Sequence, residues 1–361
     1  MPAPLRKIDL HTHILPETWP SWTARTGYAG WVELAHEQPG CARMRRTTSV
    51  DGSTPPQPFR DVRADLWDPG RRIERMDATG VSLQALSTVP IMFSYWARPG
   101  DAHDLSRLLN DHVAEVVAAH PDRFVGLGTL PMQDPDLARL ELDRCARDLG
   151  LHGVQIGTNV NGRNFDDPGI AAVLAHAQDL GAAVFVHPWD MLQHGRGADG
   201  AAIDRMPRYW LPWLVGMPAE TALAICTAIF SGLLDRLPRL RLCFAHGGGS
   251  FPGTLGRIAH GHACRPDLVA VDNPRPPSAY LAKPTGEPAR FYVDSLVHDA
   301  DALRLLLRLF TDRRVMLGSD FPFPLGEDRP GALIESMGDL PEVTTHRLLA
   351  GTAAEFLALD R

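Results

Sequence analysis

Short apolar segments rich in β-branched residues alternate with longer amphipathic segments along this chain of 361 residues. This alternation constrains the fold strongly, because strands separated by helices build parallel sheets covered by those helices. Within the segments that separate these strands, the apolar residues have the spacing of an amphipathic helix. In residues 105–117, for example, apolar side chains recur every three or four positions and form one stripe. We predict eight strands, at residues 7–10, 81–89, 124–130, 153–156, 183–186, 240–245, 291–293 and 315–317.

Eight such strands can form either an open, doubly wound sheet or a closed (β/α)₈ barrel. Polar residues near the strand ends distinguish the two folds. Histidine or aspartate stands at or just after the ends of strands one, five, six and eight. A barrel brings these ends together on one face, whereas an open sheet spreads them along its edge. The sequence therefore predicts an α/β protein, with a single TIM-type (β/α)₈ barrel domain over residues 1–361.

Two connections are too long for ordinary loops of such a barrel. Residues 14–66 lie between the first strand and the first helix and are rich in Trp, Gly, Pro and Arg. We expect them to form a small inserted subdomain over the barrel mouth. Residues 188–217 contain several glycines followed by an aromatic stretch, and they predict a lid or a loop that faces a partner.

Composition narrows the functional classes. Hydrophobic residues make up 44% and charged residues 22%, and the net charge of −7 gives no general affinity for nucleic acid. We see no uninterrupted 18-residue apolar run and no leader-like N-terminus, so we expect no membrane association and a cytoplasmic location. The five cysteines are scattered and lack CxxC spacing, which argues against a disulfide framework and a thiolate zinc site.

His11 and His13 form an HxH pair next to the first strand. Side chains two positions apart in a strand point to the same side, so both imidazoles can reach one metal ion. His187 after strand five and Asp320 after strand eight extend this pair to three imidazoles and a carboxylate, a set that suits catalytic Zn²⁺. Strand four offers neither a carboxylate nor a lysine in residues 152–157, so we expect one zinc ion per subunit.

His246, at the end of the sixth strand, is the best candidate for a general acid and base. A catalytic zinc ion lowers the pKa of bound water from about 15.7 to about 7, so a nearby group must handle the released proton. An imidazole with a pKa of ~6.5 can accept and donate protons near neutrality. The alternative interpretation is that His246 is a further metal ligand.

The HxH pair, the histidines after strands five and six and the aspartate after strand eight together resemble the amidohydrolase superfamily. Longer strings resemble one family within it, the 2-amino-3-carboxymuconate-6-semialdehyde decarboxylases, over essentially the whole chain. These strings are IDLHTHILP (8–16), GWV (30–32), LSTVPIMFSYW (86–96), GLGTLPMQ (126–133), FVHPWDM (185–191), YWLPWLVGMPAE (209–220) and LGSDFPFPLGE (317–327).

The resemblance implies non-oxidative loss of CO₂ from 2-amino-3-carboxymuconate 6-semialdehyde, giving 2-aminomuconate 6-semialdehyde in tryptophan (kynurenine) or nitroaromatic catabolism. It implies that the four residues of the metal set bind zinc and that His246 stays off the metal. It also assigns the carboxylates of this dicarboxylate substrate to Arg60 and Arg257, whose guanidinium groups can pair bidentately with them. In the family the second arginine comes from the neighbouring subunit, so the resemblance implies a homodimer in which Arg257 completes the partner's site.

Alternatives remain for several of these residues. Arg63 lies three positions beyond Arg60 and could make its contact instead, and Arg257 could pair with a surface carboxylate. Trp189 and Trp213 are candidates for lining the substrate pocket, although packing explains them equally well.

Two segments depart from the family's pattern, since residues 193–206 and 281–289 are longer than the family's usual connections. We expect them to affect lid closure or dimer contacts rather than the metal site. Three other functions stay open: decarboxylation of an aromatic acid such as a hydroxybenzoate, hydrolysis of an amide, ester or lactone, and a metal-binding scaffold without activity.

Overall fold

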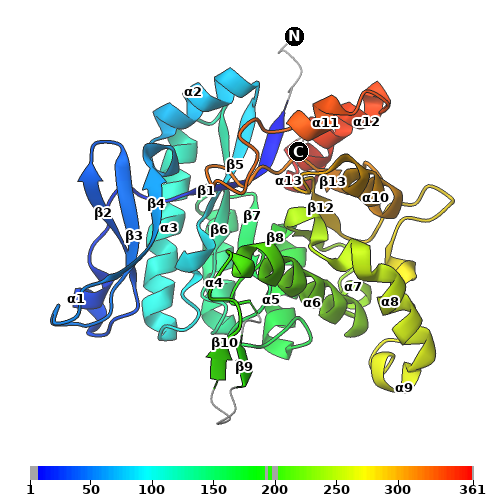
Figure 1. Ribbon diagram of the computed structural model, residues 1–361, viewed down its shortest axis with the longest axis horizontal. Helices are drawn as coiled ribbons and strands as arrows, with labels where there is room; N and C mark the ends of the chain where they lie inside the picture. The colour runs from blue at the N-terminus through cyan, green and yellow to red at the C-terminus, as the bar shows by residue number, and fades with distance from the viewer. Residues whose placement is uncertain (1–6, 192–193, 197–201, 360–361) are drawn as a thin grey trace.

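The computed structural model describes residues 7–191, 194–196 and 202–359. Strands occupy the centre, helices pack around them, and the N-terminal insertion lies to one side (Figure 1). The strands of the central sheet are β1 (Ile8–Ile14), β5 (Leu83–Thr88), β6 (Phe124–Thr129), β7 (Gly153–Gly157), β8 (Ala183–His187), β11 (Arg241–Phe244), β12 (Tyr292–Asp294) and β13 (Val315–Met316).

The eight central strands are parallel and follow one another around the sheet in chain order. Backbone hydrogen bonds between β1 and the segment after β13 bring the two edges together. Leu10 N donates to Leu317 O at 3.0 Å, and His13 N donates to Phe321 O at 2.8 Å. The fold is therefore the (β/α)₈ barrel that the alternation of strands and helices predicts.

The predicted strands and the observed ones coincide closely, with one difference that concerns the site. β1 continues to Ile14, so His11 and His13 lie within the strand instead of after it. The strand extends this far because its pairing with β5 continues to Ile14 and Thr88. His187 is the last residue of β8. All three histidines therefore belong to the C-terminal part of a barrel strand.

The helices begin where the sequence places capping residues. Asp134 and Asp167 each precede a proline, and their carboxylates accept backbone N–H bonds at the starts of α4 and α5. The outer helices are α2 (Pro69–Thr79), α3 (Pro99–Ala119), α4 (Pro135–Arg147), α5 (Pro168–Leu180), α6 (Met217–Phe230), α7 (Leu233–Arg236), α8 (Phe251–Cys264), α9 (Pro266–Val269), α10 (Ala300–Phe310), α11 (Ala332–Ser336), α12 (Glu342–His346) and α13 (Thr352–Leu357).

Alternate side chains of the strands enter two hydrophobic layers. Leu127 and Phe185 belong to the inner layer, whereas Val186 packs in the layer between the strands and the helices. Helix α13 covers the N-terminal ends of the strands, where His152 Nδ1 donates to Leu357 O at 2.9 Å. The C-terminal ends are thereby left for the functional site.

The connection between β1 and α2 forms the predicted inserted subdomain. Its antiparallel sheet has the order β2-β3-β4. Trp31 and Met44 of the insertion pack in one hydrophobic cluster with Leu105 and Leu109 of α3. Arg72 of α2, which is fully buried, ties the insertion to the barrel because its guanidinium donates to Asp65 O at 2.9 Å and to His13 O at 2.7 Å. The elements are α1 (Trp22–Thr26), β2 (Val32–Gln38), β3 (Cys41–Arg46), β4 (Gln57–Arg63) and η1 (Ala64–Leu66).

The second long connection contains an antiparallel pair, β9 (His194–Arg196) and β10 (Ala202–Asp204). Residues 192–193 and 197–201 lie outside the described residues, so the predicted lid at 188–217 and the long segment at 193–206 are described only in part. The other long segment, 281–289, is a mostly exposed loop that does not line the main cavity.

The π-helical turn η3 (Pro212–Gly216) continues directly into α6. Among the described residues this is the one helix whose length and mean hydropathy of 1.5 would allow it to cross a membrane. Core helices of globular proteins share both properties, and Glu220 and Ile225 of this helix are buried in the fold. Leu214 and Val215, near its N-terminus, are exposed. The remaining short turns are η2 (Pro90–Phe93), η4 (His246–Gly248), η5 (Pro277–Tyr280) and η6 (Arg347–Gly351).

Candidate metal centre and active site

Three histidines meet at the C-terminal mouth of the barrel. The ring centroids of His11, His13 and His187 lie 5.2 to 5.3 Å from one another. Asp320 completes the group, since its Oδ1 atom lies 2.9 Å from His13 Nε2 and 3.4 Å from His11 Nε2. All four residues are buried. The four predicted ligands therefore converge, although they come from three distant parts of the chain.

Each of the three histidines has a hydrogen-bond acceptor behind its ring, at Nδ1. Carbonyl and carboxylate oxygens accept and do not donate, so each Nδ1 carries a proton, and in the neutral ring Nε2 presents a lone pair. Such partners fix the tautomer and the orientation of metal-binding histidines. The acceptors are Asp294 Oδ2 for His11 at 2.8 Å, Thr88 O for His13 at 3.0 Å and Pro188 O for His187 at 3.0 Å.

The atoms at the centre of the group fit a divalent cation. The Nε2 atoms of His11, His13 and His187 and the Oδ1 atom of Asp320 are buried and have no hydrogen-bond partner among the described residues. Lone pairs held this close repel one another, and a cation among them turns the repulsion into attraction. Three imidazole nitrogens and a carboxylate oxygen are also a donor set typical of zinc sites that keep an open position.

Burial and charge set different protonation states within the centre. Burial lowers the pKa of His13 and lowers that of His187 well below its usual range, so both are neutral ligands near pH 7. Burial also opposes protonation of His11, but the charges of Asp320 and Asp294 and the hydrogen bond to Asp294 outweigh it and raise the pKa of His11 to about 10. Without a cation the centre therefore holds one proton on His11, which a metal ion must displace.

Asp320 keeps its negative charge although it is buried. Burial alone would raise the pKa of this carboxyl, but the charge of His11 and the close approach of the neighbouring imidazoles hold the pKa well below its usual range. Its backbone is in the left-handed region at a φ of 59°. Such a conformation is uncommon for a residue other than glycine and concentrates at functional sites.

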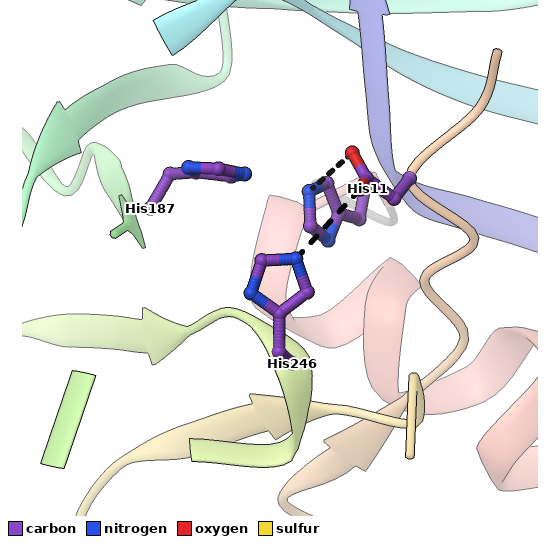
Figure 2. Close-up of side chains that lie close together, drawn as sticks. His11, His187 and His246 are labelled. Carbon is purple, nitrogen blue, oxygen red and sulfur yellow. Dashed lines mark ion pairs between the residues drawn. The ribbon is translucent and has the colours of Figure 1, made fainter. Parts of the chain in front are cut away.

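His246 follows β11 and stands beside Asp320, with its Nε2 atom 3.8 Å from Asp320 Oδ2. Its ring centroid lies 5.1 Å from those of His11 and His187, and Figure 2 shows the three rings around one point. Its candidate ligand atom lies within 4.8 Å of those of His11, His187 and Asp320. Unlike the other three histidines, it has no hydrogen-bond acceptor at Nδ1 among the described residues, and 17% of its side chain is exposed. This placement suits proton exchange with solvent. His246 is also close enough to the other candidate ligands to bind the same metal ion, which is the alternative role.

A cavity of about 700 Å³ opens over the centre. His13, His187 and Asp320 contribute to its lining, whereas His246 does not and adjoins it through Asp320. The walls are mostly apolar and include four tryptophans and two phenylalanines. Both tryptophans predicted to line a pocket do so, Trp189 after β8 and Trp213 in η3.

Arg60 of β4 extends from the inserted subdomain into this cavity. Its guanidinium carbon lies 4.5 Å from the Phe323 ring centroid and 5.6 Å from that of Trp213. Burial lowers the pKa of this guanidinium, and the charge of Asp320 partly offsets that effect. No carboxylate lies within ion-pair distance of Arg60 among the described residues, so an anionic ligand would find it unpaired.

The other arginines occupy different places. Arg63, the alternative to Arg60, is exposed and does not line the cavity. Arg257 is exposed on α8 and does not reach the cavity of its own chain. Arg46 of β3 lines the cavity although sequence reasoning gave it no role. Only tertiary structure distinguishes it from the other arginines of the insertion.

Comparison with known proteins places this site in a family. The chain matches the amidohydrolase family model over residues 8–359. It is 53% identical over 354 residues to the 2-amino-3-carboxymuconate-6-semialdehyde decarboxylase of Dictyostelium discoideum, covering 98% of this chain and 92% of the relative. The protein of the same name from Caenorhabditis elegans is 35% identical over 404 residues, covering 98% and 95%. The chain belongs to this decarboxylase family of the amidohydrolases.

Solved structures of other amidohydrolases share the barrel. The 5-carboxyvanillate decarboxylase of Sphingomonas paucimobilis matches with a TM-score of 0.74 at 25% identity, covering 98% of this chain and 99% of that one. A dihydroxybenzoic acid decarboxylase of Polaromonas, solved with manganese and 2-nitroresorcinol, matches with a TM-score of 0.74 at 23% identity, covering 98% and 97%. The second likeness is evidence for the shared fold alone.

The fourth barrel strand of this family member supports a ligand instead of supplying one. β7 contains neither a lysine nor a carboxylate. Gln155 of this strand donates through Nε2 to Thr88 O at 3.0 Å, the same carbonyl that accepts the His13 Nδ1 proton. The absence of a bridging group in β7 agrees with the expected single metal ion.

The sequence alone assigns no role to Asp294, whereas the structure places it directly behind His11. Its carboxylate accepts the hydrogen bond from His11 described above. A signal was present, because the aspartate follows the predicted seventh strand just as the ligands follow other strands. His260 and His298, also left without a role, are exposed.

The pKa pattern predicts that metal binding releases about one proton per site near pH 7.5. His11 is protonated in the metal-free centre because its pKa is raised to about 10, whereas His13 and His187 are already neutral. Lower pH should therefore weaken the binding. Calorimetric titration of metal-free protein in buffers of different ionisation enthalpy measures the protons released. Release of no protons at pH 7.5 would contradict the assigned state of His11.

Proposed function

We propose that this chain is a zinc-dependent, non-oxidative decarboxylase that converts 2-amino-3-carboxymuconate 6-semialdehyde to 2-aminomuconate 6-semialdehyde and CO₂. The observation that carries the proposal is 53% identity to the Dictyostelium decarboxylase over 98% of the chain. The buried cluster of candidate metal ligands beneath a mostly apolar cavity supports it. A cytoplasmic location and a place in tryptophan or nitroaromatic catabolism remain predictions.

His11, His13, His187 and Asp320 would hold the metal ion. Zinc fits the set because three imidazoles and one carboxylate are preferred zinc ligands, and manganese occurs in a solved relative of the same fold. When bound, the ion supplies Lewis acidity next to the substrate. The hydrogen bonds at Nδ1 keep the three rings in the tautomer that can bind it.

Arg60 would bind a substrate carboxylate. Its guanidinium is mostly removed from water between Phe323 and Trp213, so a carboxylate in the cavity would meet a strong, poorly screened charge. The planar group also matches both carboxylate oxygens. Trp189 and Trp213 would form apolar walls that keep the planar substrate in place and exclude water.

His246 would move the proton that the reaction requires. The carbon that loses CO₂ must gain a proton, and Nε2 of His246 stands next to the centre with access to solvent. The Oδ2 atom of Asp320 lies 3.8 Å from that nitrogen. His246 can therefore hold a proton beside the substrate and recover it afterwards.

The active unit would be a homodimer in which Arg257 completes the site of the partner subunit. Arg257 lies on an exposed face and cannot serve the cavity of its own chain in the described arrangement. An exposed apolar group next to the cavity supports association through this side of the molecule. The group consists of Tyr209, Trp210, Leu214 and Val215.

A second candidate is decarboxylation of an aromatic acid. The gamma-resorcylate decarboxylase of Polaromonas is 32% identical over 227 residues, which cover 59% of this chain and 66% of the relative. The aromatic walls of the cavity would also accept a benzene ring. The smaller share of the chain that matches makes this the weaker candidate.

Zinc-loaded protein should consume 2-amino-3-carboxymuconate 6-semialdehyde. The near-ultraviolet absorbance of the substrate should fall with release of one CO₂ per molecule, and chelation of the metal should stop both. The same protein should be assayed with dihydroxybenzoates and with lactones. Absence of turnover with the muconate substrate by metal-replete protein would refute the proposed function, and turnover of another class would identify the replacement.

His246→Ala should keep the metal but lose turnover by about 10²- to 10⁴-fold, because a positioned acid and base contributes that much. Metal content by mass spectrometry and the decarboxylation rate are measured together. His298→Ala, at an exposed histidine, is the matched control and should resemble the wild type. Loss of the metal from His246→Ala would instead make His246 a ligand.

Two inactive variants should restore activity when mixed if Arg257 acts across the dimer. Arg257→Ala inactivates the site of the partner subunit, whereas His246→Ala inactivates the site of the subunit that carries it. A mixed dimer therefore contains one site in which both residues are intact. Up to about a quarter of wild-type activity is expected after complete subunit exchange, since half of the dimers are mixed and each has one good site. No recovery, with exchange verified by mass spectrometry of tagged chains, would contradict a shared site.

A further inference from the structure

Asp294, the last residue of β12, lies behind the metal centre with its side chain fully buried. One oxygen, Oδ2, accepts the Nδ1 proton of His11 at 2.8 Å. The other, Oδ1, accepts the backbone N–H groups of Gly247 at 2.8 Å and Leu296 at 3.2 Å. Gly247 is the residue directly after His246. The two oxygens of one carboxylate thus contact a predicted metal ligand and the loop of the predicted acid and base.

The loop that carries His246 has an unusual backbone. Four consecutive residues have positive φ values, 54° at His246 and 62°, 77° and 60° at the glycines that follow. Glycine is required at Gly247 also by space, because a Cβ there would lie 2.4 Å from Val297 Cγ1. Such a conformation persists only where surrounding contacts hold it. The Gly247 hydrogen bond to Asp294 is one of these contacts and acts next to the imidazole.

We propose that Asp294 is a positioning residue that fixes the metal ligand and the acid–base loop at once. Through Oδ2 it keeps the His11 proton on Nδ1, so that Nε2 is available to the metal. Through Oδ1 it holds the backbone of Gly247, and this fixes the direction in which the His246 side chain points. The proposal rests on the proposed metal site and on the proposed role of His246, and it adds a common support for both.

A carboxylate is required because all three neighbours donate to it. An ionised aspartate only accepts hydrogen bonds, whereas an asparagine of the same shape carries two donor hydrogens on one side. In Asp294→Asn the amide oxygen best faces Gly247 and Leu296, because the reverse orientation would oppose two N–H groups. The amide nitrogen then faces His11 Nδ1 and drives the His11 proton to Nε2, the wrong tautomer for a ligand.

Two substitutions separate the two contacts. Asp294→Asn removes the support of His11 and keeps that of the loop, so metal affinity should fall about 10- to 100-fold while the Gly247 amide stays protected from hydrogen exchange. Asp294→Ala removes both supports, so the same loss of affinity should accompany exchange of the Gly247 amide that is about tenfold faster or more. Asp294→Ser replaces Asp294→Ala if the latter fails to fold, since its hydroxyl is too short to restore both contacts.

The experiment measures zinc affinity by competition with a chromophoric chelator and amide exchange by mass spectrometry of peptides that cover residues 246–249. Glu141→Gln is the matched control. Glu141 is a buried carboxylate that accepts a hydrogen bond from Asn110 at 2.6 Å, away from the centre. Its amide variant should lose stability without losing zinc affinity, which separates a positioning effect from general destabilisation.

The possible outcomes separate the proposed role of Asp294 from the proposed metal-dependent decarboxylase activity. Zinc affinity of Asp294→Asn within twofold of the wild type would overturn the role toward His11. Unchanged exchange at Gly247 in Asp294→Ala or Asp294→Ser would overturn the role toward the loop. If the wild type binds no divalent cation, the proposed metal site falls and this inference with it. If the wild type binds zinc without decarboxylating the substrate, the zinc affinities of the variants still decide the role of Asp294 toward His11.

Discussion

The functional centre depends on the closure of the barrel between its first strand and the segment after its last. Asp320 N donates to His11 O at 2.8 Å, and His13 N donates to Phe321 O at 2.8 Å. These backbone bonds place Asp320 beside His11 and His13, although the residues stand near opposite ends of the sequence. A slip of one residue in this register would turn the ligands away from one another, because neighbouring side chains of a strand point to opposite sides. The metal centre is thus a product of closure rather than of any single segment.

Closure gathers polar atoms that would otherwise destabilise the barrel. Three imidazole nitrogens and a carboxylate oxygen are buried without hydrogen-bond partners among the described residues, and burial of such groups without compensation costs free energy. The Nδ1 atoms of the same three rings donate hydrogen bonds to Asp294, Thr88 and Pro188. Imidazole rings that are hydrogen-bonded at Nδ1 and have an unpaired Nε2 atom are suited to binding a cation. The raised pKa of His11 has the same origin, since the buried carboxylates of Asp320 and Asp294 favour a positive charge on its ring.

The barrel and its additions serve different parts of the reaction. Three histidines of barrel strands and Asp320, in the segment after β13, are the candidate metal ligands. The cavity walls include residues of the insertion and of the segment before α6, such as Arg60 and Trp213. Solved decarboxylases with this barrel have names that specify other acids, so the fold alone does not define the substrate. Selectivity between a muconate and a benzoate therefore depends on the residues that line the cavity.

The sequence by itself determined the order of strands and helices and the barrel, because period-two and helical spacing are local patterns. From the residues at the strand ends it also predicted the candidate ligands His11, His13, His187 and Asp320, which the structure brings together. It could not show that β1 runs on through the HxH pair, since that depends on pairing with β5. It left Asp294 without a role and could not choose between Arg60 and Arg63 as the arginine in the cavity. Those choices depend on which side chains face one another across strands that meet only after folding. The tertiary structure made them because closing the barrel fixes distances that no local pattern in the chain contains.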